Sequence, residues 1–174
     1  MFFLVDPLDG TKEFLKSDGS GDFTVNIGLI LNGYPEMGII LAPAYNRLFV
    51  GARNEGAFEL VDGSFQPLVP RQFTSENRIA VASTSHPDTQ TDDWLSSNKV
   101  TKTIRIGSSL KFCFLASGMA DFYPRFGPTM EWDTAAGDAI LRAAGGMTYS
   151  CDNRVFQYGK KDYKNTAFIA KAHP

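Results

Sequence analysis

Residues 2–11 read FFLVDPLDGT, an apolar run that ends in two aspartates, a proline and a glycine. The run from Phe2 to Val5 is short and continuously apolar. It predicts a buried strand that stops at Asp6-Pro7, because proline resists continuation. Such a strand needs cover on both faces, and a domain seldom begins with its most buried element. We therefore expect a further segment of the protein to precede it.

The two aspartates of this stretch lie three residues apart, around a turn that the proline stiffens. Asp6 and Asp9 can converge on a hard cation, which prefers carboxylate and carbonyl oxygens, and the backbone carbonyl of Leu8 lies between them. Gly10 and Thr11 follow at a predicted helix start, where backbone N–H groups favour a phosphate. Taken alone, this pattern is better explained as an Asx turn followed by a helix cap.

A second acidic motif, EWDTAAGD at residues 131–138, opens a predicted helix of small residues. Small side chains let another backbone or a ligand approach closely, and Asp133 lies where the helix should begin. By itself, Asp133 is more simply an N-cap residue, and the small residues only permit tight packing. The two motifs together favour a shared site for metal and phosphate over two separate structural explanations.

Outside these motifs, the pattern changes from hairpins to alternating elements. Turn signals at Asn32-Gly33 and Asp62-Gly63 separate short apolar runs, which predicts an antiparallel meander within residues 1–70. Residues 71–174 mix strands and helices, so we expect one α+β unit. The predicted strands cover 24–31, 37–41, 48–52, 57–61, 79–82, 103–106, 121–123 and 168–170. One helix is predicted to begin within 12–16, and three others cover 88–95, 108–117 and 133–144.

The composition is that of an ordinary soluble domain, with 43% apolar and 21% charged residues in 174. A formal net charge of -2 provides no broad surface for nucleic acid or anionic membrane, so recognition of anions must be local. Cys113 and Cys151 are too few for a disulfide framework or a zinc site. Because we also find no long apolar run and no signal sequence, we expect a protein of the reducing cytoplasm.

Residues 6–11 and 132–137 resemble the two signature motifs of the inositol monophosphatase-like phosphatases, in the order and context of that family. Two further stretches, IGSSLKFC at 106–113 and YPRFGPT at 123–129, are similar to its CysQ-type 3'(2'),5'-bisphosphate nucleotidase branch. The resemblance implies the layered αβαβα fold of the family. It also implies a phosphatase that converts 3'-phosphoadenosine 5'-phosphate to AMP and phosphate, in sulfur assimilation and nucleotide recycling.

The resemblance implies a site for two or three Mg²⁺ ions and inhibition by lithium. Asp6 would bridge two ions, and the carbonyl of Leu8 would complete one of them. Asp9 and Asp133 would hold the other ion. In the family, a helical segment before the first motif adds a metal-binding glutamate and an acidic residue that helps to activate water. Neither precedes Asp6 here, so we expect an incomplete site.

The resemblance also implies substrate contacts on several segments. Thr11 would position the attacking water. Lys111 and Arg125 would bind a second phosphate, and Arg125 can also stack on the sugar or base. Without the resemblance, Lys111 would be interpreted as a solvated lysine and Arg125 as part of a surface ion pair. The full set of implied substrate contacts is Leu8, Gly10, Thr11, His86, Ser108, Lys111, Arg125 and Asp133.

The sequence leaves two alternatives open. One is an inositol monophosphatase or related sugar phosphatase, which would act on a polyol with a single phosphate. Such enzymes usually have small residues in place of 108–111 and an acidic residue near 121–123, whereas Lys111 and Arg125 here favour a second phosphate. The other is an inactive remnant that binds metal or nucleotide or associates with a partner. Its exposed sheet surface would favour oligomers.

Overall fold

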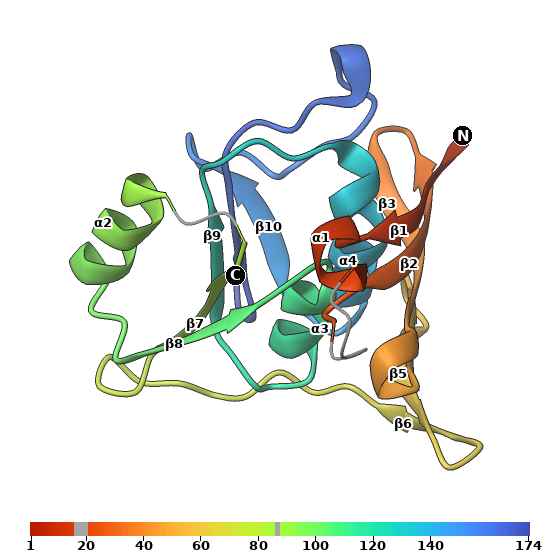
Figure 1. Cartoon of the computed structure of the whole chain (residues 1–174), viewed down its shortest axis with the longest axis horizontal. Helices are drawn as coiled ribbons and strands as arrows, with labels where there is room; N and C mark the ends of the chain where they lie inside the picture. Colours follow the sequence, from red (N-terminus) through yellow and green to blue (C-terminus); the bar gives the residue numbers. More distant parts are fainter. Residues whose placement is uncertain (16–20, 86–87) are drawn as a thin grey trace.

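The computed structural model describes residues 1–15, 21–85 and 88–174, arranged as layers of sheet and helix (Figure 1). In this part of the chain, six strands form an antiparallel sheet in the order β1-β2-β3-β4-β5-β6. Five strands form a mixed sheet in the order β10-β11-β9-β7-β8. Helices α3 and α4 lie between the sheets, and α2 contacts β9 on the far side of the smaller sheet. The α+β fold class is confirmed.

The bounds of these elements are as follows. The first sheet contains β1 (Phe2–Asp9), β2 (Thr24–Leu31), β3 (Tyr34–Ala42), β4 (Arg47–Ala52), β5 (Gly56–Val61) and β6 (Ser64–Pro67). The second contains β7 (Ile79–Ser83), β8 (Lys102–Ile106), β9 (Phe122–Arg125), β10 (Met147–Ser150) and β11 (Phe168–Lys171). The helices are α1 (Thr11–Phe14), α2 (Thr89–Ser97), α3 (Leu110–Ala116) and α4 (Glu131–Ala143), with short 3-10 turns at Pro43–Tyr45 and Lys161–Tyr163.

The opening strand differs from the prediction in length and in burial. β1 continues through Pro7 to Asp9, and its pairing with β2 shifts register between Asp6 and Asp9. Pro7 is tolerated because β1 is an edge strand of the described sheet, where proline need not interrupt a central ladder. Leu4 is 5% exposed but Phe3 is 58% exposed, so only one face of the described strand is buried.

A row of glycines crosses the first sheet beneath α4. Gly28, Gly38 and Gly51 lie opposite one another on β2, β3 and β4. A Cβ atom added to Gly38 would lie 2.1 Å from the carbonyl oxygen of Ala136, and one added to Gly28 would lie 2.8 Å from the Cβ of Ala135. The helix therefore packs directly on the backbone of the sheet. This close approach explains the small residues at the start of α4.

Two helices begin two residues away from their predicted first residues. α4 begins at Glu131, so Asp133 lies inside the first turn, where its Oδ2 accepts the N–H of Met130 at 2.8 Å. α3 begins at Leu110 because Ser108 has a left-handed backbone, with a φ of 48°. Strands β6 (SFQP) and β10 (MTYS) fall outside every predicted strand, because neither contains two adjacent apolar residues, which the equally short β9 and β11 do.

Aromatic side chains fill the core between α3 and the second sheet. Phe112 of α3 stacks on Phe168 of β11 and packs edge-on against Tyr123 of β9.

Cys113 is a buried free thiol and Cys151 an exposed one. In residues 1–15, 21–85 and 88–174, no helix has both the length and the apolar character needed to cross a bilayer.

Candidate active site

Three carboxylates meet where β1 ends and α4 begins. Asp6 and Asp9 come from the last residues of β1, and Asp133 comes from the first turn of α4. One carboxylate oxygen from each residue lies within 4.8 Å of the others, and all three residues are partly buried. The two sequence motifs therefore form a single acidic centre.

Burial raises the pKa of each of these carboxyl groups above its ordinary value. The pKa of Asp133 rises to about 6, first because burial disfavours the charged form and then because Asp9 and Asp6 are close. Burial is also the main cause of the raised pKa values of Asp6 and Asp9. At Asp9, the positive charge of Lys111 partly offsets the effect. A nearby cation would favour the charged form of all three groups.

The donor set of this centre fits a hard divalent cation. Mg²⁺ prefers oxygen ligands at about 2.1 Å, so two of its ligands are at most about 4.2 Å apart, and the three carboxylate oxygens lie within 4.8 Å of one another. Among the described residues, no lysine or arginine forms a salt bridge with any of the three aspartates. Asp6, Asp9 and Asp133 are therefore suited to hold Mg²⁺.

Asp9 is oriented by polar side chains on the first sheet. Thr24 Oγ1 and Asn26 Nδ2 each lie 3.4 Å from Asp9 Oδ2. The Ser109 hydroxyl, just before α3, donates to Asn26 Oδ1 at 2.7 Å and lies 2.8 Å from Thr24 Oγ1. Sequence reasoning missed this network. Its signal was a pair of polar residues two positions apart in an apolar strand, which places both on one face.

The turn after β1 is held by its own hydrogen bonds. The N–H of Leu8 donates to Asp6 Oδ1 at 3.0 Å, and the Thr11 hydroxyl donates to the Leu8 carbonyl at 3.4 Å. Gly10 has a φ of 87°, a left-handed conformation that glycine adopts without strain. α1 is a single turn of four residues. These contacts place Thr11 and the Leu8 carbonyl next to the carboxylates.

A pocket of about 360 Å³ opens beside the acidic centre. It brings together most of the residues that the sequence singled out. Asp6 joins them through the carboxylate cluster, and Leu8 through its hydrogen bond with Thr11. His86 lies outside the described residues. The predicted site residues in the pocket wall are Asp9, Gly10, Thr11, Ser108, Lys111, Arg125 and Asp133.

Two cationic side chains in the pocket wall are buried. Lys111 is 5% exposed, and its Nζ donates to the carbonyls of Ile106 at 3.3 Å and Ser108 at 2.5 Å. Burial lowers the pKa of Lys111 to about 8, although Asp9 partly opposes this. Arg125 is 7% exposed, and its Nη2 donates to a backbone carbonyl at 3.2 Å. Lys111 is thus not a solvated lysine, and Arg125 forms no surface ion pair among the described residues.

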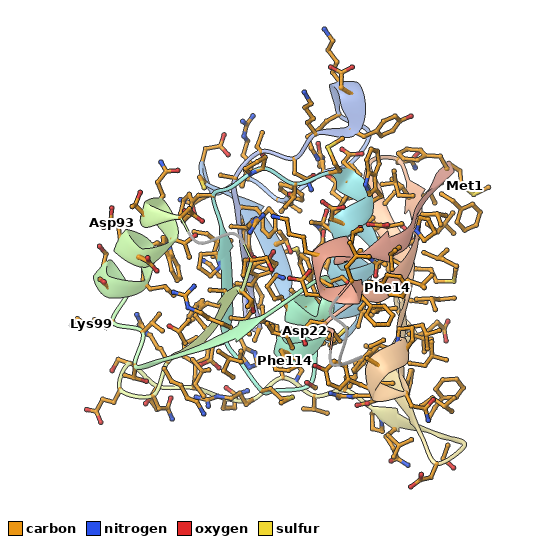
Figure 2. All side chains as sticks on the ribbon, viewed as in Figure 1. Met1, Phe14, Asp22, Asp93, Lys99 and Phe114 are labelled. Carbon is orange, nitrogen blue, oxygen red and sulfur yellow. The ribbon has the colours of Figure 1, made fainter. Side chains whose placement is uncertain are left out.

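Two acidic residues that sequence reasoning did not single out, Asp22 and Glu13, pack against Gly107 in the loop before α3. Asp22, labelled in Figure 2, accepts the N–H of Gly107 at 2.8 Å and the Tyr45 hydroxyl at 2.5 Å. Glu13 of α1 is 5% exposed and lines the pocket. Its position in a short polar stretch gave no signal of burial, because charged residues there are usually solvated.

A family model matches the full chain. The model is that of the inositol monophosphatase family, and it covers residues 1–174. The chain belongs to the inositol monophosphatase family. Two curated relatives are named 3'(2'),5'-bisphosphate nucleotidase CysQ. One, from Buchnera aphidicola, is 43% identical over 98% of this chain and 64% of its own length. The other, from Escherichia coli K12, is 41% identical over 92% of this chain and 63% of its own length.

Solved structures of this family share the fold. CysQ from Bacteroides thetaiotaomicron has a TM-score of 0.86 and 39% identity, over 99% of this chain and 70% of that one. An inositol monophosphatase from Anabaena has a TM-score of 0.80 and 26% identity, over 98% of this chain and 66% of that one. The family resemblance and its fold are therefore confirmed, although the chain spans a little under two thirds of the two curated relatives.

Proposed function

We propose that this chain carries the catalytic site of a Mg²⁺-dependent 3'(2'),5'-bisphosphate nucleotidase. The reaction would convert 3'-phosphoadenosine 5'-phosphate and water to AMP and phosphate. The burial of Lys111 and Arg125, in the same pocket wall as Asp9 and Asp133, carries the proposal. A substrate with one phosphate needs positive charge only at the metal centre. Two buried cations beside that centre fit a second phosphate.

Unpartnered polar atoms in the pocket support an anionic ligand. The Oγ of Ser108 and the Nε of Arg125 are buried without hydrogen-bond partners among the described residues. A buried polar atom left unpaired costs about 1–3 kcal/mol, and more when it is charged. A phosphate accepts hydrogen bonds from hydroxyl and guanidinium groups, so its binding would remove this cost.

The metal site rests on the three aspartates. Asp6, Asp9 and Asp133 would hold Mg²⁺, with the Leu8 carbonyl as a further oxygen ligand. When bound, Mg²⁺ supplies positive charge that polarises the phosphoryl group and acidifies the attacking water. Thr24 and Asn26 contact the Asp9 carboxylate and would orient it toward the ion. Mutation of residues that orient a metal ligand usually lowers metal affinity or activity.

The remaining groups position the reactants. The Thr11 hydroxyl, at the pocket wall, would orient the water that attacks phosphorus. The bond to the ribose 3'-oxygen breaks, and that oxygen takes up a proton to become the hydroxyl of AMP. Lys111 and Arg125 hold the 5'-phosphate away from the reacting centre. We place this reaction in the reducing cytoplasm.

Phosphate release from 3'-phosphoadenosine 5'-phosphate and from inositol 1-phosphate, with and without MgCl2, tests the proposal. We expect Mg²⁺-dependent release that strongly favours the nucleotide and that falls when LiCl is added. Preferential release from inositol 1-phosphate would support a sugar phosphatase instead. Absence of Mg²⁺-dependent release from both compounds would contradict catalysis by this chain and favour an inactive, ligand-binding remnant.

A further inference from the structure

Glu13 lies at a buried junction in the wall of the pocket. It lies on α1, is 5% exposed and belongs to the pocket wall. Its Oε1 accepts a hydrogen bond from the Ser85 hydroxyl, just after β7. Its Cγ packs on the loop before α3, because a Cβ atom added to Gly107 would lie 3.3 Å from it. Three separate segments therefore meet at this carboxylate.

A negative side chain is unexpected in a pocket that receives phosphates. The aspartate centre suits the reacting phosphate when Mg²⁺ is bound, and Lys111 with Arg125 suits the second phosphate. Glu13 would repel either phosphate. It lies within electrostatic reach of Lys111, because its charge is among the causes that raise the pKa of that lysine. The carboxylate therefore lies next to the two phosphate positions but not at either of them. The uncharged part of a bisphosphate substrate must occupy the space beside it.

We infer that Glu13 is a specificity-determining residue that accepts a hydrogen bond from the nucleoside part of the substrate. This inference rests on the proposed function. A carboxylate accepts hydrogen bonds, so its partner in the uncharged part of the substrate is a neutral N–H or O–H donor. A nucleoside offers two such donors, a ribose hydroxyl and an exocyclic amino group of the base. A site built to bind a donor rejects an analogue that lacks it, because the carboxylate then loses one of its hydrogen bonds.

The test compares kcat/KM for three substrates that differ by one donor. The first is 3'-phosphoadenosine 5'-phosphate, which is also called adenosine 3',5'-bisphosphate. The second is its 2'-deoxy analogue, which lacks the ribose hydroxyl, and the third is inosine 3',5'-bisphosphate, which lacks the amino group. We expect the wild-type chain to prefer adenosine bisphosphate over one analogue by roughly 10- to 100-fold, as for a hydrogen bond to a charged group. The rejected analogue identifies the donor.

Two variants of Glu13 show whether this preference depends on the carboxylate. Glu13→Gln keeps the size of the side chain but removes its charge, and Glu13→Ala removes the acceptor. Both should reduce the preference, and Glu13→Ala should reduce it to within a few-fold of unity. Ser85→Ala is the matched control, because it removes the partner of Glu13 but leaves the carboxylate in place. Its preference among the three substrates should equal that of the wild type.

The outcomes separate this inference from the proposed function. A wild-type chain that is active on the nucleotide but does not discriminate against either analogue would overturn the inference alone. Glu13 variants that slow all three substrates equally would also overturn it. That result would show that Glu13 only holds the loop before α3 in place. A wild-type chain that is inactive on every bisphosphate would overturn the proposed function and the inference together.

Discussion

Two aspartates of helix α4 lie in opposite environments. Asp138 is fully buried, and its oxygens accept hydrogen bonds from Arg142 at 3.0 and 2.7 Å and from the Tyr158 hydroxyl at 3.0 Å. Asp133 is partly exposed, and its carboxylate faces those of Asp6 and Asp9. The protein alone stabilises the first carboxylate, whereas the second stands among like charges.

This contrast separates a structural aspartate, Asp138, from one that we propose to bind a metal ion, Asp133. A buried carboxylate without a partner costs free energy, and Arg142 removes this cost at Asp138. At Asp133 the cost persists in the metal-free protein, as its raised pKa shows. Clusters of carboxylates with perturbed pKa values in a cleft are typical of functional sites. The carboxylates around Asp133, at the start of α4, therefore lower the free energy of unfolding of the metal-free protein. A bound cation would raise it again.

The largest effect on stability should follow from breaking the structural pair. Asp138→Ala leaves the Arg142 guanidinium, which is 13% exposed, without its carboxylate partner. Removing one member of a buried ion pair usually costs about 3–5 kcal/mol in the free energy of unfolding. Urea denaturation followed by circular dichroism measures this. Asp152→Ala, which breaks an exposed pair with Arg154, is the control and should cause no resolvable change.

The largest effect on activity should follow from the ligand-binding acid. Asp133→Asn removes the charge of a proposed metal ligand, so Mg²⁺-dependent phosphate release should fall by more than the roughly 10- to 100-fold typical for a residue that only supports a ligand. The free energy of unfolding without metal should stay the same or rise, because a like charge is removed. Retained phosphate release in this variant would show that the second motif does not bind the metal.

A smaller effect should appear in the pH dependence of stability. The pKa of Asp133 is about 6 in the folded protein and 3.8 in its ordinary environment. Between these values the folded state binds more protons than the unfolded state, so the free energy of unfolding without metal should fall as pH rises through this window. Each pKa unit corresponds to about 1.4 kcal/mol. Thermal denaturation should show the fall in the wild type and a weaker one in Asp133→Asn.

The smallest effect concerns the cation that faces the acidic centre. The pKa of Lys111 is lowered to about 8, mainly by burial. As pH rises above this value the ammonium loses its proton and its attraction for phosphate. The KM for the nucleotide should therefore rise, by at most roughly tenfold per pH unit. A Lys111→Gln variant should have a high KM that changes little over the same range. A wild-type KM that stays constant from pH 7 to pH 9 would contradict the role of Lys111.

The fold was predictable where local residues determine it. Asn32 and Gly33 both have positive φ values, as expected for a two-residue hairpin turn, and β2 and β3 pair around them. The length of β1 was not predictable, because the register shift that accommodates Pro7 depends on pairing with β2. Edge position and exposure of Phe3 likewise depend on which strands are neighbours.

The carboxylates proposed as metal ligands could be singled out from the sequence, but the residues that support them could not. Asp9 and Asp133 lie in short motifs whose turn and helix start are determined by neighbouring residues, so both aspartates can be identified from the sequence. Thr24 reaches Asp9 only because the register of β1 and β2 places them opposite each other. The burial of Lys111 and Glu13 also depends on distant segments that close over them. Such long-range contacts leave little trace in a single sequence.

Calorimetric titration of the chain with MgCl2 at neutral pH tests the central claim most directly, which is that Asp6, Asp9 and Asp133 form a metal site. We predict saturable binding to the wild type with release of protons, because the carboxylates must ionise to bind the ion. Asp152→Asn, an exposed control, should bind equally well, and Asp133→Asn should bind far more weakly. Equal Mg²⁺ affinity in the wild type and Asp133→Asn, or no saturable binding to the wild type, would contradict the account.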